Sequence, residues 1–106
     1  MTSAEVRALV EAEIGDDWSQ SNLHGVNLRT CLVAPRKVTC RNTFPQLSGG
    51  RPLDMWIVLE EKPGTRDGYI IVFDEEKKSF GLADWEGDTP AFFGYYGTFL
   101  VALSGM

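Results

Sequence analysis

The sequence predicts a single α+β domain with an N-terminal helix, an antiparallel sheet of about five strands and a C-terminal helix packed on that sheet. Three observations support this prediction. The chain opens with apolar residues at helical spacing, continues at 53–85 with three apolar segments separated by two polar turns, and closes with a largely apolar run. Its 106 residues match the commonest size of one domain, so we expect one domain over residues 1–106.

The first helix is expected at Ser3–Ile14. Thr2 precedes Glu5 by three residues, which is the capping-box pattern that satisfies the free amides at a helix start. Gly15 can adopt the left-handed conformation that often ends a helix. The apolar residues of this segment recur on one stripe, which we expect to face the sheet: Val6, Leu9, Val10 and Ile14.

An irregular connection is expected at 16–26, because this segment is rich in Ser, Asn, Asp and Gly. Trp18, Leu23 and Val26 are its apolar residues. We expect these three side chains to fix the connection to the core.

A hairpin is expected next, formed by Leu28–Val33 and Val38–Thr43. The four-residue loop between them contains Pro35, whose φ near about −65° suits the first central position of a type I turn. A symmetric loop of this length would place Cys31 opposite Cys40. We therefore expect two reduced, neighbouring and buried thiols that perform no redox or nucleophilic step.

A loop is expected at 44–52, which contains two prolines and a Gly-Gly pair, and a three-stranded meander at Leu53–Trp85. The strands of this meander are apolar on both faces, and such strands are normally covered on both faces. Two helices side by side cannot cover both, so some apolar positions are expected to need a partner. These positions include Trp56, Val58, Ile70 and Val72.

The last helix is expected at about Pro90–Leu103. Thr89 resembles an N-cap, and a proline at the first helical position is common. Gly94 and Gly97 would weaken this helix by about 1 kcal/mol each relative to alanine. The glycines and the lack of a basic flank after the run favour a buried helix over a membrane span.

The composition excludes several classes of protein. Apolar residues make up 43% and charged residues 24%, which is typical of globular proteins and not of disordered chains. The net charge of −5 disfavours general binding to nucleic acid or to an anionic membrane surface. Met1–Val10 lacks the features of a secretory signal, and two cysteines are too few for a disulfide framework. We therefore expect a cytoplasmic protein with free thiols.

No pattern in the sequence indicates a catalytic, metal or cofactor site. His24 is the one histidine and has no acidic or thiol partner at a metal-binding spacing, so a structural role is the simpler interpretation. The most informative feature is a segment at 18–53 without acidic residues, which contains five basic ones: Arg29, Arg36, Lys37, Arg41 and Arg51. These residues have two interpretations, a solvated edge hairpin or a patch that recognises an anionic group or an acidic partner.

Two functional hypotheses follow. The first is a non-enzymatic protein-interaction module that forms a homodimer and also binds another protein, because surplus apolar surface accompanies the absence of catalytic motifs. The second is a small-molecule-binding protein or enzyme, with a pocket between the C-terminal helix and the sheet. The candidate binding residues for the two hypotheses are Arg29, Arg41, Arg51, His24, Trp56, Tyr95 and Tyr96.

Overall fold

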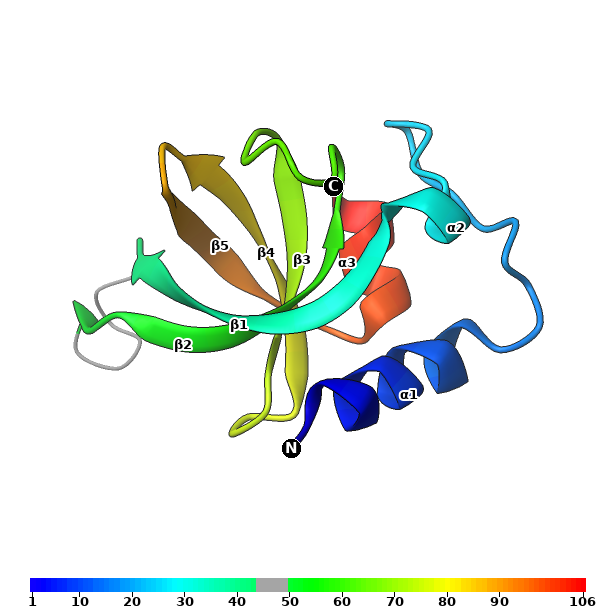
Figure 1. The fold of residues 1–106 in the computed structure, drawn as a ribbon, viewed down its shortest axis with the longest axis horizontal. Helices are drawn as coiled ribbons and strands as arrows, with labels where there is room; N and C mark the ends of the chain where they lie inside the picture. Colours follow the sequence, from blue (N-terminus) through cyan, green and yellow to red (C-terminus); the bar gives the residue numbers. More distant parts are fainter. Residues whose placement is uncertain (44–49) are drawn as a thin grey trace.

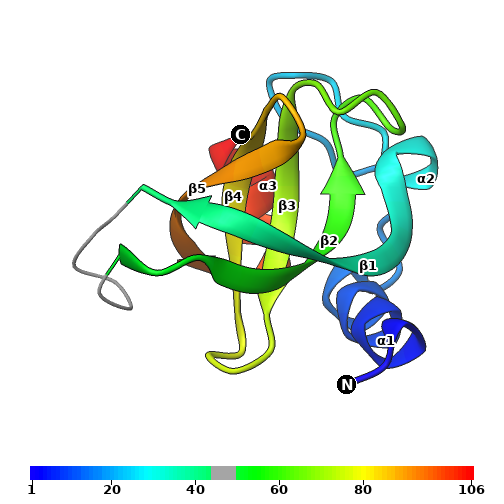
Figure 2. The ribbon, with the colours of Figure 1, turned by 60° about the vertical axis from the view of Figure 1, so that its left-hand side comes forward.

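The computed structural model describes residues 1–43 and 50–106 of the chain. These residues form the elements α1 (Ser3–Ile14), α2 (Leu28–Cys31), β1 (Leu32–Asn42), β2 (Leu53–Glu60), β3 (Tyr69–Asp74), β4 (Ser79–Glu86), β5 (Thr89–Gly97) and α3 (Phe99–Gly105). The five strands follow one another around a closed barrel, and α1 and α3 lie on its outside (Figures 1 and 2). The predicted α+β class is therefore confirmed, but the sheet is closed and mixed instead of plainly antiparallel.

Helix α1 has the predicted bounds and the predicted N-terminal cap. The Thr2 hydroxyl accepts a hydrogen bond from the Glu5 amide at 3.2 Å, and the Glu5 carboxylate accepts one from the Thr2 amide at 2.8 Å. Gly15 ends the helix with a φ of 66°. Val6, Val10 and Ile14 are buried against the barrel, as their spacing predicts.

The predicted hairpin at 28–43 is wrong. Residues 28–31 form the short helix α2, and residues 32–42 continue as one strand, β1. Pro35 does not turn the chain. It lies within β1, where the pairing with β2 is irregular, between Leu32 and Arg36. A bulge of this kind leaves the missing proline N–H without consequence for the ladder of hydrogen bonds.

The two cysteines are buried and free, as predicted, but they do not face each other. Cys31 belongs to a cluster on the outside of the barrel, and Cys40 belongs to the cluster inside it. The opposed pair was wrong because it depended on the hairpin, and both cysteines instead lie at or near one long strand.

The predicted helix at Pro90–Leu103 is also wrong over most of its length. Residues 89–97 form β5, which pairs antiparallel with β4 and parallel with β1 at Arg41 and Asn42. Aromatic residues favour strands and glycines disfavour helices, and both are frequent in this segment. The helix is restricted to α3, where the Thr98 hydroxyl accepts from the Val101 amide at 3.2 Å.

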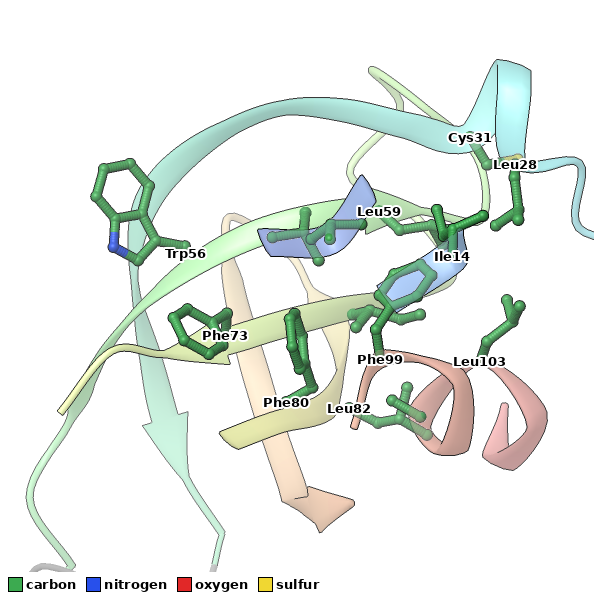
Figure 3. Close-up of a cluster of buried hydrophobic side chains, with 14 of the residues drawn as sticks. Ile14, Leu28, Cys31, Trp56, Leu59, Phe73, Phe80, Leu82, Phe99 and Leu103 are labelled. Carbon is green, nitrogen blue, oxygen red and sulfur yellow. The ribbon is translucent and has the colours of Figure 1, made fainter. Parts of the chain in front are cut away.

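The meander at Leu53–Trp85 is confirmed as β2, β3 and β4, and the chain itself covers both of its faces. Ile70 and Val72 point into the barrel and are fully buried, whereas Trp56 and Val58 belong to the outer cluster. In Figure 3 the outer cluster places Phe99 and Leu103 of α3 near Phe80 and Leu82 of the sheet, with Ile14 of α1 close by. The apolar positions that predicted a dimer are thus buried within one chain.

The structure describes only the last three positions of the predicted loop at 44–52, and they precede β2. In the part of the chain that the structure describes, no helix is long and apolar enough to cross a membrane.

Candidate functional site

The five basic residues between positions 29 and 51 do not gather into one patch. Arg29 lies on α2, before β1 begins, and Arg41 lies near the far end of β1. Among the described residues, carboxylates face Arg36, Lys37 and Arg41. These ion pairs are Arg36–Glu60 at 2.5 Å, Lys37–Glu75 at 3.7 Å and Arg41–Glu86.

The Arg36–Glu60 pair shows how such a contact serves the fold. The Glu60 side chain is only 2% exposed, and its second oxygen accepts a hydrogen bond from the Gly64 amide at 2.8 Å. A buried carboxylate is costly unless it is paired and hydrogen-bonded. Arg36 therefore compensates the buried charge of Glu60 and so stabilises the barrel.

Trp56 and Arg51 line a groove of about 490 Å³ between the start of β2 and the turn from β3 to β4. The Trp56 indole donates a hydrogen bond to Glu75 at 2.9 Å, and Lys37 lies 5.3 Å from the centre of its ring. Hydrogen bonds from the N-terminal amine and from this indole lower the pKa of the Glu75 carboxyl to about 2.

The edge of β2 at this groove has features that deter strand addition. Its residues Leu53–Met55 pair with β1, whereas the pairing of β2 with β3 begins only at Trp56. Pro52 and Asp54 flank Leu53, and prolines and charges are the usual protection of a strand edge. The groove is therefore better explained as a protected edge with internally paired charges than as a binding site.

The aromatic residues of the predicted pocket do not converge. Tyr95 packs against Phe92 inside the barrel, and its hydroxyl donates to Asp74 at 2.6 Å. Tyr96 is 39% exposed and lies beside Gly105 of α3, away from the groove that Trp56 lines. The space between α3 and the sheet is filled by buried side chains, as Figure 3 shows.

His24 joins the loop between α1 and α2 to the barrel. Its Nδ1 lies 2.8 Å from a Glu61 carboxylate oxygen, and its ring centre lies 5.6 Å from that of Tyr69. The other Glu61 oxygen accepts from the Tyr69 amide at 3.1 Å. This backbone hydrogen bond, together with the contact from His24, lowers the pKa of the Glu61 carboxyl. His24 therefore fixes one side of the loop.

Asn22 fixes the other side. Its side-chain nitrogen donates to the Leu103 carbonyl at the end of α3, at 2.8 Å. Its side-chain oxygen accepts from the amides of His24 at 2.9 Å and Val26 at 3.3 Å. The Gly25 amide donates to the Asn22 carbonyl at 3.0 Å and closes a turn. The loop is thus held to α3 and to the barrel by polar contacts.

Leu23 lies between these two fixed residues and is 99% exposed. The prediction that Leu23 contributes to the core is wrong, whereas Val26 is buried as expected. A signal for this outcome exists in the sequence, because Asn22 and Gly25 enclose a four-residue turn, and the residues at the tip of such a turn point outward. Single exposed apolar side chains are common on protein surfaces, but a fully exposed leucine on a loop that hydrogen bonds already hold is a candidate contact for a partner.

A second feature of the same loop is a hollow of about 380 Å³. The Arg29 guanidinium lies at this hollow, 5.5 Å from the centre of the Trp18 ring. The remaining lining consists of four polar residues, Ser19, Gln20, Ser21 and Asn27, together with Gly25 and Val26. The loop between α1 and α2 therefore presents both an exposed leucine and a polar hollow with one cation.

Within residues 1–43 and 50–106, His, Cys, Asp and Glu side chains form no group of three that could hold a metal ion. His24 and Glu61 form a histidine–carboxylate pair of the kind found in active sites, but here their contact fixes the loop. Comparisons of the chain with protein-family models, with curated proteins and with solved structures found no significant match.

Proposed function

We propose that this protein is a non-enzymatic protein-interaction module whose contact with its partner is centred on Leu23. The observation that supports this proposal is the full exposure of Leu23 on a loop held by Asn22 and His24. A soluble chain gains nothing by fixing a leucine in water, whereas burying such a side chain in a complex is worth about 1.5–3 kcal/mol.

Preorganisation adds to this gain. A flexible loop loses conformational freedom when it binds, and that loss opposes association. The hydrogen bonds of Asn22 meet this cost when the chain folds, before any partner arrives. The partner is therefore expected to offer an apolar pocket that fits one leucine side chain.

Self-association stays a prediction, but it now depends on Leu23 and no longer on surplus apolar residues of the sheet. The surplus apolar residues that first suggested it, such as Trp56 and Val72, are buried within the chain. A second copy of the chain is the partner only if the contact between copies includes Leu23. A dimer that does not depend on Leu23 would have no support from the apolar residues of the barrel.

Site-specific photo-crosslinking tests the proposal. A benzophenone amino acid replaces Leu23 in one variant and Val101 in a control variant, and both are irradiated in the cells in which the protein occurs. Val101 is a suitable control because it is apolar, 49% exposed and located on α3. We expect a crosslinked protein from position 23 and none from position 101. A product containing only this chain would identify the partner as a second copy.

The crosslinked partner then allows a direct measurement of affinity. Leu23→Ser should weaken binding by about tenfold to a hundredfold, since that is the equivalent of losing one buried leucine. The same change should leave the free energy of unfolding within about 0.5 kcal/mol, because the side chain is exposed. Equal crosslinking from the two positions, or unchanged affinity of Leu23→Ser, would refute the proposal.

A further inference from the structure

The surroundings of Arg29 differ from those of four other arginines that the structure describes. Arg29 has no carboxylate within 4.0 Å among the described residues, and its guanidinium lies over Trp18 instead. Arg51 also has an interaction within the protein. The remaining four each face a carboxylate, in the pairs Arg7–Glu11, Arg36–Glu60, Arg41–Glu86 and Arg66–Asp88.

We propose that the hollow beside Arg29 is a binding subsite for one carboxylate group, supplied by an acidic residue of the partner that contacts Leu23. This inference rests on the proposed function for the identity of the ligand's carrier. The chemistry of the subsite itself rests on Arg29, Trp18 and Asn27, which line the hollow.

The guanidinium is the group that would recognise the carboxylate. Its planar fork of N–H donors matches the two oxygens of a carboxylate, and stacking on an aromatic ring orients that fork. The side-chain oxygen of Asn27 accepts from the Arg29 amide at 2.9 Å, so the Asn27 NH₂ group remains as a second donor at the same hollow. Two donors on neighbouring residues suit a small planar anion.

Charge favours a carboxylate over a phosphate. One guanidinium neutralises one negative charge, whereas a phosphate monoester has a charge of about −1.5 to −2. The protein has a net charge of −5, which further disfavours a doubly charged anion. Most residues that line the hollow belong to the same loop as Leu23, so a partner that covers this loop would contact both.

Titration with sodium acetate, followed by ¹⁵N NMR at constant ionic strength, tests the subsite without the partner. The signals are the side-chain Nε–H of Arg29 and the indole N–H of Trp18. We expect saturable shifts of both signals, and we expect Arg29→Gln to abolish the shift of the Trp18 indole. Weaker binding of inorganic phosphate than of acetate is the expected result of the parallel titration.

Arg66→Gln is the matched control. Arg66 also lies over a tryptophan, at 6.0 Å from the Trp85 ring, but it is paired with Asp88 at 2.7 Å. This variant should bind acetate as the unmodified protein does. Absence of a saturable shift, retention of the shift in Arg29→Gln, or tighter binding of phosphate would overturn the subsite.

The outcome for Leu23 is separate. Leu23→Ser should keep acetate binding, because Leu23 does not line the hollow. Failure of acetate binding together with crosslinking at position 23 would overturn the subsite and leave the interaction module standing. Acetate binding without any crosslink at position 23 would support the subsite and refute the proposed function.

Discussion

Burial controls the chemistry of Cys40. This side chain is fully buried inside the barrel, and burial is the main reason that the pKa of its thiol rises to about 12. The negative charge of the nearby Asp54 raises that pKa further. Because the thiolate is the reactive form of cysteine, Cys40 is expected to be inert in the folded protein.

Thiol labelling checks this expectation. In a Cys31→Ala variant, the remaining Cys40 should react with a disulfide reagent at pH 8 only as fast as the barrel opens, and much faster in denaturant. The Cys40→Ala variant reports Cys31, which is 7% exposed, and it should react sooner than Cys40 does. Rapid labelling of Cys40 in the native protein would show that this side chain is not inside a closed barrel.

The sequence predicted the burial of single residues better than it predicted which residues they contact. That both cysteines are buried and free was predictable from their apolar surroundings, but their separation depends on β1 being one strand. The partner of His24 was not predictable, because Glu61 lies 37 positions further along the chain. Leu23 was misread because apolar residues are usually buried, although the turn residues around it indicated an exposed tip.

At the scale of elements, local patterns predicted what local interactions determine. The capping box and the helical stripe gave α1 its correct bounds, and the alternating apolar segments gave β2, β3 and β4. Pro35 and Pro90 misled the prediction, because prolines usually mark turns and helix starts. Both lie in strands, Pro35 at an irregularity of β1 and Pro90 near the start of β5. Tertiary pairing, which no local pattern records, decides these two segments.

Gly81 of β4 is required by the close approach of β5. A Cβ atom at this position would lie 2.5 Å from the Gly94 carbonyl oxygen and 2.7 Å from the Phe92 ring. Gly81→Ala should therefore lower the free energy of unfolding by about 1–3 kcal/mol, as overpacking of a core does. Denaturant unfolding measures this change.

Gly105→Ala is the control for Gly81→Ala. Its Cβ would approach the ring of Tyr96, which is 39% exposed and can move aside. We expect a change within about 0.5 kcal/mol for this variant. Equal stability of the two alanine variants would contradict the described packing of β4 against β5.

At the scale of the whole molecule, barrel closure explains strands that are apolar on both faces. One face encloses the interior cluster with Ile57, Val72 and Phe92, and the other face lies under α1 and α3. A flat sheet would have left one face without cover, and that geometry led to the predicted dimer. The parallel contact of β1 with β5 closes the barrel and could not be predicted from either strand alone.

Once both faces are covered, Leu23 stands out among the large apolar side chains that the structure describes. It is 99% exposed, whereas Val101, Met1 and Tyr96 are 39–49% exposed. The loop around it is fixed to α3 by Asn22 and to Glu61 by His24. We therefore expect the folded protein to hold this leucine rigidly in water.

Backbone ¹⁵N relaxation of the free protein measures this rigidity. The amides of Leu23 and His24 should have order parameters of about 0.85, equal to those of the barrel strands, since the hydrogen bonds of Asn22 restrict the loop. Asn22→Ala should lower these values while leaving those of α1 unchanged. Order parameters below about 0.6 for Leu23 and His24 in the unmodified protein would show instead that the loop is flexible and that Leu23 is not held in place.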